Sequence, residues 1–170
     1  KHEVDKGSTV YNVRVDSATL QNQDVKDAAA VGDEGCSITT IEDMHQVLDG
    51  LKLEEHPLYV YGGASALPLL SLAIAALKAS GKSPKKLRGF IGGQLVRQGK
   101  GLAPLVQLYD EMAECARWAV KNAPELRTVM VRDDVFSRGG CNDVQDMAYT
   151  LAMAVAYIRA MMERGLTINE

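Results

Sequence analysis

The stretch Leu58-Tyr-Val-Tyr-Gly-Gly63 decides the fold class, because a short apolar run ends in two glycines and a helical pattern follows from about Ala66 to Ala79, before Gly81. The same succession of strand, turn and helix recurs along the chain. Strands that alternate with helices are typical of a parallel sheet covered by helices. We therefore predict an α/β fold with a single domain over residues 1–170.

Three more strand–helix units surround this one. The other expected strands are short apolar runs bounded by turn residues, namely Val10–Val15, Leu87–Ile91 and Thr128–Arg132. The other expected helices cover roughly Ile41 to Leu51, Leu102 to Asn122 before Pro124, and a segment that begins after Asn142.

Capping patterns mark two of these helix starts. Thr39 followed by Glu42, and Asn142 followed by Gln145, have the spacing of a capping box. The last helix then carries large apolar residues on one face at spacings of three or four: Met147, Leu151, Val155, Ile158 and Met162.

Four strand–helix units fit two architectures, half of an eightfold (β/α)8 TIM barrel or an open doubly wound sheet. The hydrophobic periodicity does not choose between them. Four strands of a barrel leave two open sheet edges, and such edges tend to pair with other chains. We therefore expect the segment alone to dimerise or to gain partner strands.

The composition excludes several classes of protein. The formal net charge is -3, with 46% hydrophobic and 24% charged residues, which gives no support for nucleic-acid binding. The longest apolar stretch, Ala66 to Leu77, is too short to span a membrane. The N-terminus has no signal-peptide pattern, and the absence of an initial methionine suggests an excised segment or a processed product.

The cysteines indicate a reducing compartment. Cys36, Cys115 and Cys141 are odd in number and widely spaced, which fits reduced cytoplasmic thiols better than disulfides. The His and Cys clustering of a zinc site is absent from the sequence, so no metal is expected.

Ligands of both architectures approach the carboxyl ends of the strands. Gly pairs there can present backbone amides to an anion such as phosphate, although we favour backbone geometry as their role. Adjacent carboxylates can ligate a metal or act in acid–base chemistry, although turn capping or solvent exposure is the more common role. The residues at these ends are Asp16, Gly62 and Gly63, Gly92 and Gly93, and Asp133 and Asp134.

Other apparent motifs are discarded. Gly81-Lys-Ser83 resembles the end of a phosphate-binding loop, but the required earlier glycine is Ala76 and the tripeptide precedes a strand. No motif places a nucleophile beside His2, His45 or His56. The residues alone therefore give an α/β domain with no evident catalytic set.

Nearly the whole chain resembles the methylmalonyl-CoA mutase family, in one order and with short deletions. The most specific part is the closing run, which resembles the family in residue type over some thirty positions. The stretches that carry the resemblance are Val13-Arg-Val-Asp-Ser-Ala-Thr19, Thr39-Thr-Ile-Glu-Asp-Met44, Val47-Leu-Asp-Gly50, Leu87-Arg-Gly89, Arg138-Gly-Gly-Cys-Asn142, Gln145-Asp-Met-Ala-Tyr-Thr-Leu-Ala152, Tyr157-Ile-Arg159 and Gly165-Leu-Thr-Ile168.

This resemblance implies a segment of a CoA-ester-binding (β/α)8 barrel, with about four of its eight strands. Such mutases interconvert succinyl-CoA and methylmalonyl-CoA by a radical rearrangement, in propionate or succinate metabolism, and adenosylcobalamin does the difficult chemistry. Their cobalamin-binding domain lies outside this segment, so none of the cofactor is expected to bind here.

The departures from the family imply that the segment is not catalytic. Gly92 holds the position of a substrate-contacting glutamine, Val135 that of a histidine that hydrogen-bonds the thioester, and Asp134 that of the neighbouring tyrosine. Leu20 replaces a histidine that faces cobalamin, and an arginine-bearing loop is shortened between Arg97 and Leu102. Losing one preorganised donor typically costs roughly 10²–10³-fold in rate.

Three hypotheses follow. The first is the small, non-catalytic subunit of a heterodimeric mutase, whose partner is the large catalytic chain. The second is an active mutase for another acyl-CoA, which would use Arg132, Asp133 or Asp134. The third is a flavodoxin-like binding module, for which the strand order would reverse within the sheet.

Overall fold

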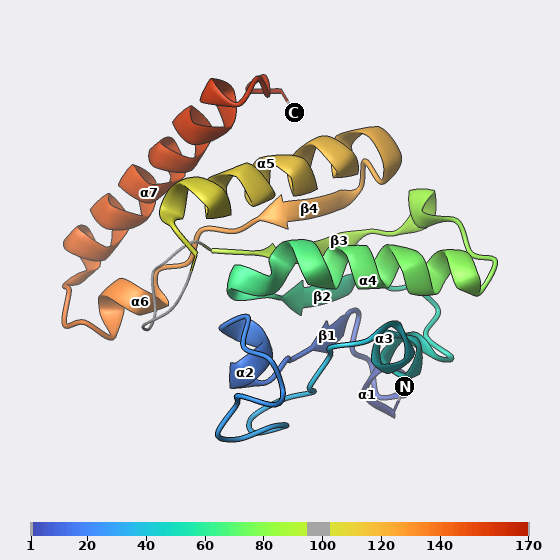
Figure 1. Cartoon of the computed structure of the whole chain (residues 1–170). Helices are drawn as coiled ribbons and strands as arrows, with labels where there is room; N and C mark the ends of the chain where they lie inside the picture. The colour runs from blue at the N-terminus through green and yellow to red at the C-terminus, as the bar shows by residue number, and fades with distance from the viewer. Residues whose placement is uncertain (1, 95–102, 170) are drawn as a thin grey trace.

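The computed structural model describes residues 2–94 and 103–169, and its centre is a sheet of four parallel strands (Figure 1). These are β1 (Tyr11–Val13), β2 (Leu58–Tyr61), β3 (Gly89–Gly93) and β4 (Leu126–Val129). Their order in the sheet is β1-β2-β3-β4. Because this order has no reversal, it fits an arc of a (β/α) barrel and not the doubly wound sheet of the flavodoxin-like hypothesis.

Helices connect the strands and cover one face of the sheet, as Figure 1 shows for α4 and α5. The main helices are α3 (Ile41–Leu48), α4 (Ala66–Ala79), α5 (Leu105–Asn122) and α7 (Asp143–Glu163). Short turns of helix lie between them, namely α1 (His2–Asp5), α2 (Ser17–Leu20), η1 (Gly63–Ser65), η2 (Pro84–Lys86) and α6 (Asp134–Ser137). None of the helices in the described part of the chain is both long and apolar enough to cross a membrane.

The core lies between the sheet and these helices. Leu58 and Val60 of β2 and Ile91 of β3 are almost fully buried. They belong to one apolar cluster with residues of α3, α4 and α5, which include Met44, Leu48, Leu69, Leu70, Ala73, Ala76 and Cys115. Burial of this apolar surface is the main force that holds each strand–helix unit together.

Several expected boundaries were wrong by a few residues. The first strand is confined to Tyr11–Val13, and the third and fourth strands begin at Gly89 and Leu126 instead of Leu87 and Thr128. The predicted capping box of α3 is also wrong by one residue. Thr40 and Asp43 form it, not Thr39 and Glu42.

Two helix limits differ as well. The helix α3 ends at Leu48 and not at Leu51, whereas α5 begins at Leu105. The expected start of that helix at Leu102, and the shortened loop between Arg97 and Leu102, lie outside the described residues.

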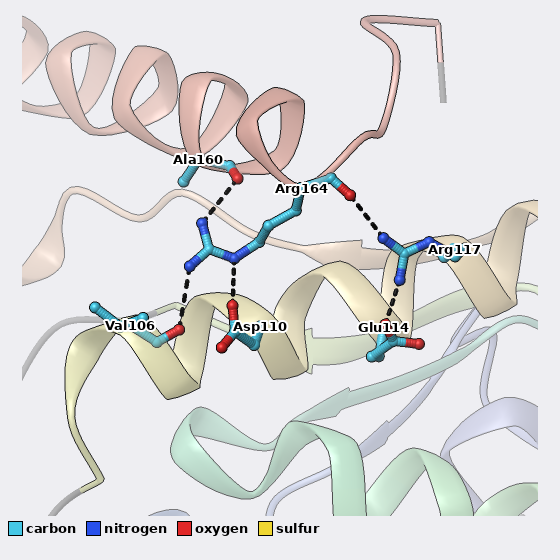
Figure 2. Close-up of polar contacts among 6 residues, drawn as sticks. All are labelled: Val106, Asp110, Glu114, Arg117, Ala160 and Arg164. Atoms are coloured by element: carbon cyan, nitrogen blue, oxygen red, sulfur yellow. Dashed lines mark hydrogen bonds and ion pairs between the residues drawn. The ribbon is translucent and has the colours of Figure 1, made fainter.

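The last helix is fixed to α5 by Arg164 (Figure 2). Its guanidinium donates to Asp110 Oδ1 at 2.7 Å, to the Ala160 carbonyl at 3.0 Å and to the Val106 carbonyl at 3.2 Å. Arg117 of α5, which also pairs with Glu114, donates to the Arg164 carbonyl at 2.8 Å. The bonds to Asp110, to Val106 and from Arg117 hold the C-terminal end of α7 against α5, whereas the bond to Ala160 lies within α7 (Figure 2).

Candidate functional site

A cavity of about 740 Å³ lies at the carboxyl ends of the strands. Its walls come from all four strand–helix units, because the ends of parallel strands meet at the same edge of a sheet. The polar lining includes Arg14 after β1, Tyr61 at the end of β2, Gln94 after β3, and Arg132 and Asp134 after β4. This is where the sequence predicts a ligand site.

The loop after β1 is built around the carboxylate of Asp16, which is fully buried. It accepts hydrogen bonds from the Thr19 amide at 2.9 Å and from the Gly32 amide at 2.7 Å. Burial by itself raises the pKa of Asp16, but the hydrogen bonds from Thr19, Gly32 and Ser37 outweigh it and hold the pKa below its usual value. Asp16 therefore caps α2 and orders the loop.

The glycine pair after β2, Gly62 and Gly63, has a role in backbone packing. The Gly62 amide donates to the Gly92 carbonyl at 2.7 Å, so it is already engaged. Gly63 has a φ of +54° and lies against the Leu20 carbonyl, a conformation and an approach that glycine permits. Ser65 adds a hydrogen bond to the Thr19 carbonyl at 2.5 Å. Gly62 thus bonds to the third strand–helix unit and Gly63 packs against the first, as the backbone interpretation predicts.

The glycine pair after β3 lies where the strand pairing is irregular. The register of β3 and β4 shifts between Phe90 and Gly93. A β-carbon at Gly92 would overlap the carbonyl oxygen of Thr128, and one at Gly93 would overlap that of Gly63. The backbone on either side of β3, at Thr128 and at Gly63, therefore occupies the space that side chains at Gly92 and Gly93 would need.

The residues after β4 form an ion-paired network. Arg132 donates to Asp134 Oδ2 at 2.7 Å, and its guanidinium lies over the Tyr61 ring, 4.7 Å from the centroid. Arg138 is a weaker partner of Asp134, with 3.9 Å between Nε and Oδ2. Burial raises the pKa of the Tyr61 hydroxyl, Arg132 opposes this rise and Asp134 adds to it.

Gln94 connects this network to α7. Its side chain is buried, and Nε2 lies 3.0 Å from the Arg132 carbonyl and 3.2 Å from Met153 Sδ. Burial of an amide requires such partners. Neither Gln94 nor Tyr61 was a predicted site residue, although each lies at or just after a strand end, which is the signal that singled out the glycines and aspartates.

The structure brings together part of the predicted set. Leu20, Asp134 and Val135 line the cavity, whereas Gly92 packs against β4 beneath it. Asp133 precedes α6, where its carbonyl accepts from the Phe136 amide at 2.8 Å. In residues 2–94 and 103–169, no three His, Cys, Asp or Glu side chains converge as metal ligands.

His45 and His56 lie away from the cavity. His45 is on α3, with Nδ1 3.4 Å from Ser80 Oγ, and His56 packs edge-on against the Tyr11 ring, 5.5 Å between centroids. The His2 side chain lies outside the described part of the structure.

A model of the methylmalonyl-CoA mutase family matches residues 1–170, the whole of this sequence. This chain belongs to the methylmalonyl-CoA mutase family. The family uses adenosylcobalamin as its cofactor.

Curated relatives are similar over most of this chain but are much longer. The methylmalonyl-CoA mutase of Escherichia coli (strain K12) is 28% identical over 171 residues, which are 96% of this chain and 24% of that protein. The mitochondrial methylmalonyl-CoA mutase of Homo sapiens is 24% identical over 177 residues, 100% of this chain and 24% of that protein. The methylmalonyl-CoA mutase large subunit of Streptomyces virginiae is 27% identical over 143 residues, 82% of this chain and 20% of that protein. The chain thus spans about a quarter of the length of the first relatives.

The cavity of this mutase-family chain is lined by Leu20, at the position that the resemblance assigns to the cobalamin side. The Leu20 side chain is aliphatic and offers no nitrogen or oxygen, and no histidine is among the described lining residues. The polar groups that do line the cavity are arranged in pairs with one another, such as Arg132 with Asp134 and Arg14 with Glu34. The described residues therefore supply no cobalt ligand.

Proposed function

We propose that this chain is a barrel segment of the small, non-catalytic subunit of an adenosylcobalamin-dependent methylmalonyl-CoA mutase. Its role is structural, and its partner is the large catalytic chain that interconverts succinyl-CoA and methylmalonyl-CoA. We place it in the cytoplasm, where its three unpaired cysteines would stay reduced.

The observation that carries this proposal is the state of the strand ends. The backbone of Thr128 fills the space that a glutamine at Gly92 would need, and Val135 lines the cavity with a side chain that donates no hydrogen bond. Asp134 is held by Arg132 at 2.7 Å. A scaffold that retains the family fold while its ligand-facing groups are absent or already paired fits a structural subunit.

The test measures turnover of methylmalonyl-CoA with added adenosylcobalamin. The chain alone should show no product, and it should co-purify with a catalytic mutase chain when both are expressed together. Turnover by the chain alone would overturn the proposal. Failure to co-purify in either order of tagging would overturn the assignment of the catalytic chain as its partner.

One observation favours a second candidate, an active mutase for a different acyl-CoA. The cavity holds Tyr61, Gln94 and Arg132 in contact with one another, and such polar groups could position an acyl group. Under this alternative, one member of an acyl-CoA panel is converted in the presence of adenosylcobalamin, and Arg132→Met abolishes the conversion. The screen uses the full-length protein, and absence of product from every acyl-CoA there rules the alternative out.

A further inference from the structure

We draw no further inference here: the strongest candidate, the exposed apolar face of α7 formed by Val144, Met147, Leu151, Val155, Ile158 and Met162, carries none, because nothing in residues 2–94 and 103–169, which the structure describes, shows what covers it.

Discussion

A β-carbon on Gly92 would overlap the Thr128 carbonyl, so the absence of a side chain there is part of the strand pairing. Gly92→Gln should therefore not create an active site. It should lower the free energy of unfolding by about 1–3 kcal/mol or more, because β3 and β4 must move apart to admit the side chain. Urea denaturation checks this, with Val135→Gln as the control, since that position already holds a side chain at the cavity wall. Equal stability of Gly92→Gln and the original chain would contradict the steric argument.

Asp16 should contribute stability that depends on pH. Its folded pKa lies below the usual value, so the contribution is present above the unfolded pKa of about 3.9 and is lost as pH falls through the folded pKa. Asp16→Asn should cost about 1–3 kcal/mol at neutral pH, because the amides of Thr19 and Gly32 lose their charged acceptor. The difference between variant and original should shrink below about pH 4. Asp33→Asn, at an exposed position, should show no such difference in urea titrations.

Cys115 should be inert although it is a free thiol. Burial raises its pKa to about 12, and Glu111 and Glu114 add to the rise. At pH 8 the thiolate, which is the reactive form, is then on the order of 10⁻⁴ of the population. An aromatic disulfide reagent should label exposed Cys36 in the folded chain and Cys115 only after unfolding. Cys115→Ala should leave the fast phase of labelling in the folded chain unchanged, and a smaller fast phase in this variant would contradict the expectation.

At the scale of elements, the sequence predicts β2 and α4 to the residue because glycines and the apolar period bound them on both sides. It misplaces the starts of β3 and β4 by two residues, since the start of each strand depends on pairing with the neighbouring strand, which the local sequence does not determine. The capping box at Asn142 is confirmed, whereas that of α3 falls on Thr40 because two adjacent threonines offer the same side chain.

The candidate site is less predictable than the elements. Strand ends locate the cavity, and Asp134 and Val135 lie there as the resemblance implies. The roles of Gln94 and Tyr61 depend on contacts with Arg132, which is distant in sequence. Likewise, the period of the last helix identifies its apolar face but not what covers that face, and the structure leaves it exposed.

The joint between α5 and α7 should depend on Arg164, whose side chain is largely buried and bonds to Asp110 and to two carbonyls (Figure 2). Asp110 is exposed, so the loss in Arg164→Ala comes mainly from the carbonyl bonds and from packing on the Tyr109 ring. We expect a loss of about 1–3 kcal/mol and faster amide hydrogen exchange in α7. Lys121→Ala, at an exposed site of α5, should leave the amide exchange of α7 unchanged. Equal exchange rates of α7 in Arg164→Ala and Lys121→Ala would contradict the role of Arg164.

For the molecule as a whole, the four strands in the order β1-β2-β3-β4 leave β1 and β4 at the two edges of the sheet. Strand edges that lack a partner tend to pair with other chains. We therefore expect this chain alone to self-associate as its concentration rises, because a second chain can supply strands at these edges. Light scattering over a concentration series measures the mass, and a clean monomer at high concentration would contradict the expectation.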